Sequence, residues 1–272
     1  MVRPADRRQL AQWMVKAKAF SQRRACRIAG LTRRSYDRQT KRQPDQAVEQ
    51  AITFVTGQHP GWGFWKVYHR LRRQGHPYNH KRVWRVYRQM KLNLPQRKRK
   101  RLPARLRQPL AQPTAMNQAW SLDFMSDALR DGRRFRTLNV LDDYNRQALG
   151  IEIDYSLPAG RVIRLLQRLV EAYDKPAKLR CDNGPEFISG ALSEWCEQQS
   201  IELCWIQPGK PTQNAYSERF NGSFRREVLD AYSFANLAQV REVVEKWLED
   251  YNTKRPHQAL GFLTPVEYKQ AA

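Results

Sequence analysis

Residues 204–221 read CWIQPGKPTQNAYSERFN, and this stretch indicates how the second half of the chain folds. It begins apolar, as the end of a buried strand does, and it breaks at the Pro-Gly pair 208–209. Beyond the turn the sequence favours a helix, in which Glu218 lies about one turn from the start and shares a face with Asn214 and Asn221. The stretch therefore predicts a strand, a turn and a helix that presents a carboxylate.

Two aspartates further upstream stand in comparable places. Asp123 interrupts the apolar residues Trp120, Leu122 and Phe124, which alternate and so point to the other face of a strand. Asp182 follows a short strand-like run, at the strand end where α/β folds usually place functional residues. Each aspartate also has a plain alternative, because a buried carboxylate can be paired within the protein and Asp-Asn-Gly is a common turn sequence.

Taken together, Asp123, Asp182 and Glu218 indicate a site for divalent metal ions that acts on nucleic-acid phosphates. Carboxylates are hard oxygen ligands suited to Mg²⁺ or Mn²⁺, and two such ions can activate an attacking oxygen and stabilise a leaving one. Thirty-five residues separate Asp182 from Glu218. The chain has no Gly-rich phosphate loop and no Ser or Tyr in a nucleophile setting, so neither NTP hydrolysis nor a covalent intermediate is indicated.

The segment 113–272 alternates between strand-like and helical runs. Strands are expected around Asp123 and over the ranges 135–141, 147–153, 177–181 and 201–206. Helices are expected over the ranges 158–173 and 236–251, around Trp195 and after the turn at 208–212. Asp142 and Asp143 are assigned to the turn between the second and third strands. This order predicts an α/β domain with a five-stranded mixed sheet and helices on both faces.

The first 42 residues predict a helix-turn-helix module. Ser21 and Thr32 can each cap a helix, and Gly30 supplies the tight turn between them. The second of these helices presents the candidate DNA contacts Arg33, Arg34 and Arg38. An earlier helix is expected over 8–20, with one apolar stripe formed by Leu10, Trp13, Met14, Ala17 and Phe20. An ordinary helical hairpin is the alternative, and the charge of the segment favours DNA binding.

Residues 46–94 predict a second basic helical module. Two helices are expected on either side of a break at 59–63, and Asn79 is expected to cap a third. The inner face of that third helix is predicted to contain Val83, Trp84, Val86, Tyr87 and Met90. Its outer face presents the candidate DNA contacts Lys81, Arg82 and Arg85. His76 and His80 are interpreted as surface or capping residues, because no cysteine pair completes a zinc site.

The segment 95–112 is interpreted as an extended basic linker that also follows DNA. Prolines flank its charges, and it cannot build a core. Its candidate DNA contacts are Arg97, Lys98, Arg99, Lys100 and Arg101.

The charge distribution separates the two halves of the chain. The net charge of the 272 residues is +23, and residues 1–110 hold 29 Lys and Arg against 4 Asp and Glu. Clustered cations at this density indicate nucleic-acid binding through phosphate neutralisation. No apolar run is long enough for a membrane span, no signal peptide is recognisable, and the four cysteines read as buried thiols, so cytoplasmic residence is expected.

Three motifs in series resemble those of the DDE transposases of bacterial insertion sequences. They are WSLDF at 120–124, DNGPEF at 182–187 and QPGKPTQNAYSERFNG at 207–222. The similarity is closest to the second-frame product of insertion-sequence family three, whose core is similar to retroviral integrases. The tail YNTKRPHQALG at 251–261 also resembles that family, and the resemblance extends over nearly everything from about residue 50 onward.

The resemblance implies an RNase H-like catalytic core and an enzyme activity. By this resemblance Asp123, Asp182 and Glu218 hold two Mg²⁺ (or Mn²⁺) ions. Water, and then a freed DNA 3′-OH, would attack phosphodiester bonds at the ends of the element and in the target. The expected activity is thus DNA strand cleavage and strand transfer without a covalent protein–DNA intermediate.

Further DNA contacts and partners follow from the same resemblance. Asn221 and Arg225, three and seven residues after Glu218, should share its face and contact DNA, and Lys210 should touch phosphate at the edge of the site. The expected partners are double-stranded DNA, from the terminal repeats and the target, further copies of the chain on that DNA, and an upstream-frame protein joined as a fusion. No membrane partner is expected, and the chain would be associated with the nucleoid.

Two alternatives remain open at this point. A nuclease of RNase H type would share the fold, but the basic helical modules and the 35-residue spacing argue against it. A non-catalytic DNA-binding protein or regulator derived from a transposase is the other alternative, against which the intact Asp-Asp-Glu set argues. The zinc module with two His and two Cys of retroviral integrases is absent from the sequence, and basic helical modules stand in its place.

Overall fold

A computed structural model of the chain describes residues 4–37, 44–95, 113–182, 184, 187, 190–206 and 214–271. These residues form two compact units, Met1–Gln46 and Ala47–Ala272. Several of the candidate DNA contacts lie outside the described residues, namely Arg38, Arg97, Lys98, Arg99, Lys100, Arg101 and Lys210. No helix within the described ranges has both the length and the apolar content needed to cross a membrane.

The described residues of the first unit form three helices. They are α1 (Pro4–Lys18), α2 (Gln22–Ala29) and α3 (Arg33–Asp37). Ser21 accepts the Arg24 N–H and caps α2, Gly30 follows with a left-handed φ of 63°, and the Thr32 hydroxyl accepts the Ser35 N–H at 3.2 Å. The two caps and the glycine turn predicted from the sequence are confirmed, because each side chain satisfies a helix-terminal group.

The predicted apolar stripe of α1 is wrong in part. Leu10 and Trp13 are 45% and 51% exposed, whereas Ala11 is fully buried. The core that α1 joins contains Ala25 and Ala29, with Met14 and Phe20 packed against them. These small residues bring the helices close together, so an alanine occupies the contact that the larger side chains were expected to fill.

The helical part of the second unit contains α4 (Gln46–Gln58), α5 (Phe64–Arg73) and α6 (His80–Gln89). Its core contains Val48, Ile52, Trp62, Val83 and Tyr87, among others, and the Asn79 side chain caps α6 by accepting the Lys81 N–H at 2.9 Å. The predicted helices and the Asn79 cap are therefore confirmed. The predicted burial of Trp84 is wrong, since its ring is 40% exposed and lies edge-on to Phe64.

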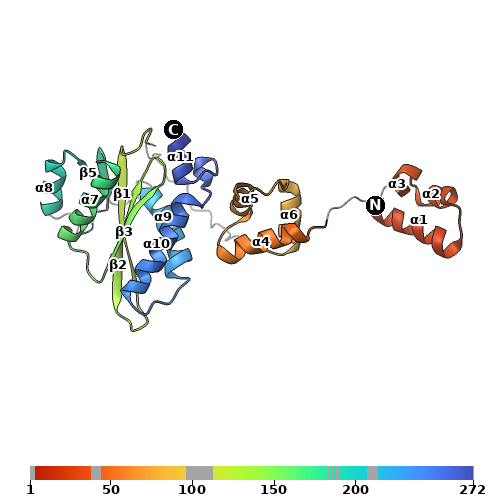
Figure 1. The fold of residues 1–272 in the computed structure, drawn as a ribbon, viewed down its shortest axis with the longest axis horizontal. Coiled ribbons are helices and arrows are strands. Elements are labelled where there is room, and N and C mark those ends of the chain that lie inside the picture. Colours follow the sequence, from red (N-terminus) through yellow and green to blue (C-terminus); the bar gives the residue numbers. More distant parts are fainter. Residues whose placement is uncertain are drawn as a thin grey trace, which may run out of the picture. The chain divides into compact units, whose positions relative to one another are not determined.

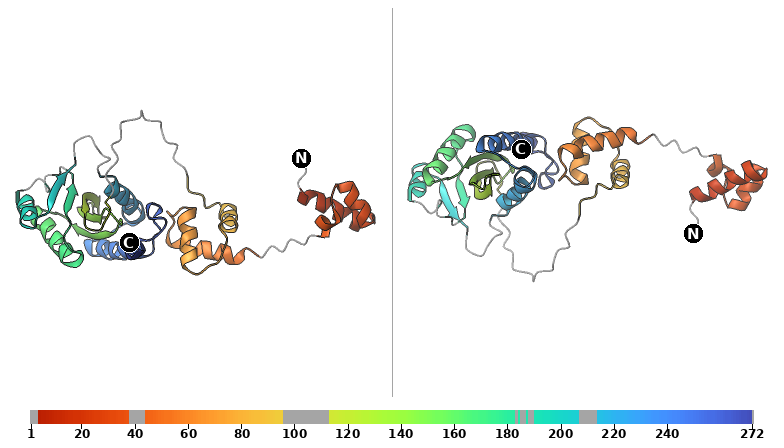
Figure 2. Two further views of the ribbon diagram at one scale, coloured as in Figure 1. Left: turned by 90° about the horizontal axis from the view of Figure 1, so that it is seen from above. Right: turned by 90° about the horizontal axis from the view of Figure 1, so that it is seen from below.

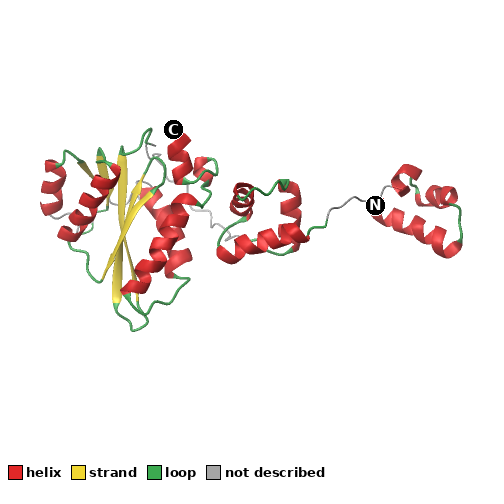
Figure 3. Cartoon of the chain, viewed as in Figure 1, coloured by secondary structure: helices red, strands yellow, loops and turns green. Residues whose placement is uncertain are grey.

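A five-stranded mixed sheet forms the centre of the second unit. Its strands are β1 (Ala119–Ala128), β2 (Arg134–Asp142), β3 (Ala148–Asp154), β4 (Lys178–Cys181) and β5 (Glu202–Trp205), in the spatial order β3-β2-β1-β4-β5. β1, β2 and β3 pair antiparallel, and β4 and β5 add in parallel beside β1. Figure 3 shows all the described strands in this one sheet, as the sequence predicts.

Helices cover both faces of the sheet, as Figures 1 and 2 show. α7 (Ala159–Tyr173) and α8 (Gly190–Gln198) pack on the face that presents Trp120, Leu122 and Val140. α9 (Ala215–Phe224) and α10 (Leu237–Thr253) pack on the face that presents Phe135 and Leu141. The two faces follow from the alternation of side chains along each strand.

Three elements were not predicted from the sequence. A π-helical turn (Arg225–Leu229) continues α9, a 3₁₀ turn (Gln258–Leu260) follows α10, and α11 (Pro265–Ala271) ends the described chain. Their short, irregular apolar patterns carry no helical periodicity over a long window. Of the four cysteines, Cys26, Cys181 and Cys196 are buried and Cys204 is half-buried, close to the expectation.

Candidate active site

Asp123 lies in the middle of the sheet, on the face that α9 covers. It pairs in register with Asn139 of β2, and its side chain is half-buried. Burial, followed by the negative charge of Asp182 and that of Glu218, raises the pKa of Asp123 to about 6. Asp182 and Glu218, the other two carboxylates predicted from the sequence, therefore both interact electrostatically with Asp123.

Asp182 enters the same region from the strand next to β1. In the parallel register Ser121 pairs with Arg180, so that Asp123 and Asp182 each lie two residues further along neighbouring strands. Asp182 immediately follows β4, and its Oδ1 accepts the Gly184 N–H at 2.9 Å. The turn role considered for this aspartate is thus real, but the same turn fixes one carboxylate oxygen at the end of the strand.

Glu218 comes from a third element, the first turn of α9. The helix begins at Ala215, and the Glu218 side chain is exposed. A carboxylate in the first turn interacts favourably with the positive end of the helix dipole. Among the residues that the structure describes, no three His, Cys, Asp or Glu side chains are close enough together to hold a metal ion.

Two asparagines hold Asp123 in place. Asn221 of α9 donates from Nδ2 to Asp123 Oδ2 at 2.8 Å, and Asn139 donates from Nδ2 to Asn221 Oδ1 at 2.7 Å. Asn139 is fully buried. The chain of amides therefore links β1, β2 and α9 and orients the first carboxylate. Asn221 was expected to contact DNA, and here it acts within the protein.

Replacing Asn139 with Ala is expected to lower the rate of DNA strand cleavage at saturating DNA by about tenfold while DNA affinity stays unchanged. The substitution leaves Asn221 Oδ1 without its donor, and groups that orient site carboxylates typically contribute 10–100-fold in activity or metal affinity, on the order of one to two powers of ten. Single-turnover cleavage and DNA-binding titrations on the same preparations measure the two quantities.

Thr137 provides a matched control for Asn139. It lies two residues away on the same strand and is also fully buried, but its hydroxyl has no hydrogen-bond partner among the described residues. Thr137→Val should therefore keep the cleavage rate within about twofold of the wild-type rate, because this substitution leaves no hydrogen-bond donor or acceptor without its partner. Equal losses in both variants would mean that Asn139 acts only through the packing of β2.

Arg225 is tied to the protein at the end of α9. It donates to the Ser126 carbonyl at 2.8 Å and to Asp127 at 3.2 Å, and the π-helical turn begins at this residue. A regular helical face from Glu218 through Asn221 to Arg225 was expected, and the change of helix type at Arg225 interrupts it. The Arg225 side chain is 38% exposed, which leaves part of the guanidinium accessible.

A buried ion pair, which sequence analysis missed, supports the two aspartate-bearing strands. Asp143 is fully buried and contacts Arg180 and Ser121, each at 2.5 Å. Ser121 and Arg180 are the registered pair that precedes Asp123 and Asp182. The turn assignment of Asp143 is correct, and the residue also joins β1 to β4, because a buried carboxylate needs charged or hydrogen-bonding partners.

The remaining described candidates for DNA contacts lie on the helical parts. Arg33 and Arg34 are exposed on α3, Lys81 and Arg85 are exposed on α6, and Arg82 is half-buried. The placement of the three α6 residues agrees with the outer face predicted for that helix.

Comparison with protein families identifies the two parts of the chain. Residues 113–211 and 199–265 match models described as the integrase core domain, and residues 43–100 match an HTH-like domain. The HTH-like match therefore falls on α4–α6 rather than on the helix-turn-helix pattern at 1–42. A chain of the simian T-cell lymphotropic virus intasome has a similar fold, with a TM-score of 0.54 at 15% identity over 83% of this chain and 75% of that chain. The fold is thus that of an integrase core.

Proteins of bacterial insertion elements are similar over nearly the whole chain. The 39.2 kDa protein of IS476 from Xanthomonas euvesicatoria is 36% identical, with 97% of this chain and 77% of that protein covered. The 31.7 kDa protein of IS407 from Burkholderia multivorans is 39% identical, with 92% of this chain and 90% of that protein covered. The chain belongs to the insertion-element transposases with an integrase core, of the IS3 type.

Proposed function

We propose that this chain catalyses metal-dependent cleavage and strand transfer of the DNA of its insertion element, with Asp123, Asp182 and Glu218 as the catalytic residues. DNA transposition is the activity of its family. The observation that most supports the assignment is the electrostatic interaction of Asp182 and Glu218 with Asp123. The negative charges of Asp182 and Glu218 act on Asp123 from a neighbouring strand end and from a helix, and repulsion of this kind favours a bound cation.

The three carboxylates are suitable ligands for a divalent cation. Integrase-core proteins depend on divalent metal ions, and carboxylate oxygens are the ligands that Mg²⁺ and Mn²⁺ favour. Asp123, Asp182 and Glu218 would hold the ions, and a bound pair would lower the barrier for in-line attack on a phosphodiester bond. Burial is the largest cause of the raised pKa of Asp123, and a cation would relieve the repulsion by Asp182 and Glu218 that adds to it.

Other residues of the chain would orient the three carboxylates or bind the DNA. Asn221 donates an amide hydrogen to Asp123, Asn139 donates one to Asn221, and the Gly184 N–H donates to one oxygen of Asp182. Glu218, exposed at the start of α9, is accessible to a DNA strand. The excess of cations in residues 1–110 supports binding of double-stranded DNA through its phosphates, as does the HTH-like match.

We further propose a division of the chain by role. Residues 1–42 and 46–94 would be two DNA-binding modules, 95–112 a basic linker, and 113–272 the catalytic core. Several copies would assemble on paired element ends, and fusion to an upstream-frame protein would add a further module.

Cleavage of the element's own end tests the proposal. Wild-type protein with Mg²⁺ should nick labelled end DNA, and neither Asp182→Asn with Mg²⁺ nor wild type in EDTA should do so. If the chain alone does not nick, the same pair of proteins is assayed as fusions with the upstream frame. Nicking that Asp182→Asn retains would exclude the assigned residues.

Replacing both Arg33 and Arg34 with Gln is expected to weaken binding to any duplex and to reduce its dependence on salt. Each phosphate contact adds about 0.9 to the slope of log affinity against log salt, so the slope should fall by up to about 2. Fluorescence anisotropy across a series of salt concentrations measures this slope. Replacing Arg164 and Arg168, which are exposed on α7, with Gln removes equal charge and should leave the slope unchanged.

A further inference from the structure

A cavity of about 680 Å³ lies on the side of α9 that faces away from Glu218. Tyr216, Arg219 and Ser223 line it, at spacings that share one helix face, whereas Glu218 and Asn221 occupy the opposite face. α5 and the segment after α10 complete the walls. Its volume is in the range of about 300–1,000 Å³ that is usual for ligand sites.

The cavity is strongly cationic. Lys66, Arg146, Arg219 and Arg255 all line it. Acids lie near these cations as well. Asp142 and Asp143 interact electrostatically with Arg146, and the Glu227 carboxylate pairs with Arg255 and accepts the Trp247 indole N–H at 3.0 Å. Burial, and then the neighbouring charge of Arg255, lowers the pKa of Lys66 to about 7. An anion in the cavity would offset this repulsion, and a phosphate is the anion that suits several converging cations.

Aromatic side chains lie among these cations. Trp65 lines the cavity and is 51% exposed. The Arg146 guanidinium lies over the Tyr216 ring, with its central carbon 3.3 Å from the centre of that ring. Phe262 adds a third ring. Of these rings Trp65 is exposed, whereas Tyr216 and Phe262 are half-buried. An exposed ring beside cations is the combination that binds single-stranded nucleic acid, because a base stacks on the ring while the cations neutralise the backbone.

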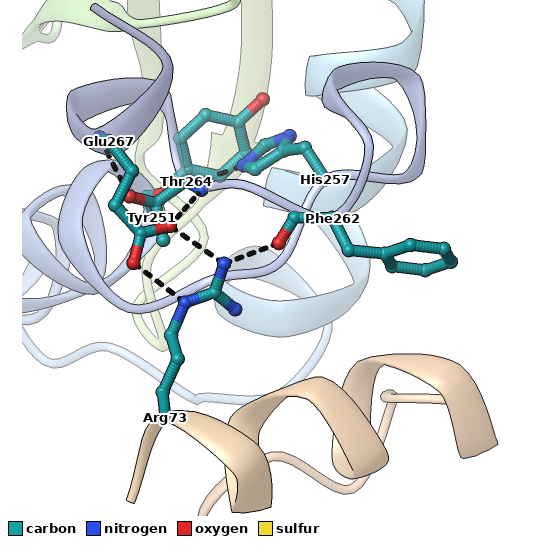
Figure 4. A network of polar contacts seen from close by, with 6 residues as sticks. All are labelled: Arg73, Tyr251, His257, Phe262, Thr264 and Glu267. Carbon is teal, nitrogen blue, oxygen red and sulfur yellow. Dashed lines mark hydrogen bonds and ion pairs between the residues drawn. The ribbon is translucent and has the colours of Figure 1, made fainter. Parts of the chain in front are cut away.

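The wall formed by α5 and the C-terminal segment is held by polar and stacking contacts. Arg73 makes two hydrogen bonds to the Glu267 carboxylate, both at 2.7 Å, and donates to the Phe262 carbonyl (Figure 4). The His69 ring stacks on Phe262 at 4.1 Å. The cavity is therefore preorganised before a ligand enters, which reduces the entropy lost on binding.

We infer that this cavity binds an unpaired nucleotide of a DNA strand, with the base against Trp65 and the phosphate against Lys66 and Arg219. The inference rests on the proposed function only for the choice of DNA as the ligand. Since α9 separates the cavity from the three carboxylates, the same helix would contact one strand on each side.

Binding of tailed and blunt DNA tests the inference. A labelled duplex with a four-nucleotide single-stranded tail is compared with the blunt duplex of the same sequence, by anisotropy in EDTA so that no cleavage is needed. Wild type should bind the tailed duplex about tenfold more tightly than the blunt duplex. This ratio corresponds to the lower end of the free energy expected when one base stacks on an aromatic side chain. Trp65→Ala and Arg219→Gln should lose this preference and keep their affinity for blunt DNA within about twofold.

Matched variants control for folding and charge. Phe54→Ala removes an exposed ring from α4 and Arg164→Gln an exposed cation from α7, both outside the cavity, and each should retain the preference. Trp65→Phe keeps an aromatic ring and should retain most of the preference for the tailed duplex.

Equal binding of both duplexes by wild type, or an unchanged preference in Trp65→Ala and Arg219→Gln, would overturn the inference. Neither result would affect the cleavage test of the proposed function.

Discussion

Glu218→Gln is expected to lower DNA strand cleavage by at least about 10³-fold while DNA affinity stays within about twofold. The amide is almost isosteric with the carboxylate, so that α9 should fold unchanged, but it removes one of three negative charges that interact at Asp123. Loss of a charged metal ligand removes several kcal/mol of transition-state stabilisation, and each 1.36 kcal/mol is about a factor of ten in rate. Single-turnover cleavage and binding titrations give the two numbers.

A second exposed glutamate controls for the lost charge. Glu245 lies on α10, outside the site, and Glu245→Gln should cleave like wild type. Retained cleavage in Glu218→Gln would remove this residue from the catalytic set. A parallel loss of DNA binding would instead indicate that Glu218 has a structural role in α9.

Arg255→Met is expected to destabilise the second unit by roughly 3–5 kcal/mol, the cost of leaving a buried charge without its partner. Arg255 is only 4% exposed and pairs with Glu227, whose side chain is 16% exposed. It also donates to the Ser223 hydroxyl at 3.2 Å and lies over the Trp62 and Tyr251 rings. The substitution keeps an apolar side chain of comparable length but removes the ion-pair partner of the half-buried Glu227 carboxylate, which keeps its hydrogen bond from Trp247.

Urea unfolding of both proteins measures the difference, with Lys246→Met as the control. Lys246 pairs with Glu242 on the surface, where the loss should be below about 1 kcal/mol. Burial by itself would raise the pKa of Glu227, yet Arg255 holds it below the ordinary value of 4.5. Its stabilising contribution in wild type is therefore complete above pH 4.5 and is lost as the pH falls through the lower folded-state pKa. The difference between the proteins should shrink below that pH, and a difference that grew on acidification would contradict this account.

The sheet and its helices could be predicted because their signals are local. Alternation of Trp120, Leu122 and Phe124 fixed the face of Asp123, and Asn79, Ser21 and Gly30 marked helix ends by their own chemistry. Trp13 and Trp84 were misplaced because periodicity gives the direction of a side chain but not the size of the neighbour it meets.

The supporting parts of the site could not be predicted, since each depends on residues far apart in the chain. Asn139 and Asn221 are 82 positions apart, and Asp143 and Arg180 are 37 apart. In the sequence, Asn139 is one polar residue in an apolar strand and Asp143 is one residue of a turn. Only the fold brings Asn139 into register with Asp123, and only the fold joins Asp143 to Ser121 and Arg180, which lie two positions before the candidate catalytic aspartates.

The most direct test of the central claim is a titration of the metal-free protein with Mn²⁺, followed by electron paramagnetic resonance of the unbound ion. Mn²⁺ favours the same oxygen ligands as Mg²⁺ and is directly detectable. Wild type should bind Mn²⁺, and Asp123→Asn, Asp182→Asn and Glu218→Gln should each weaken that binding by at least about tenfold, whereas Glu245→Gln should not. Equal Mn²⁺ binding by wild type and all three variants would contradict the assignment of these carboxylates to one metal-dependent site.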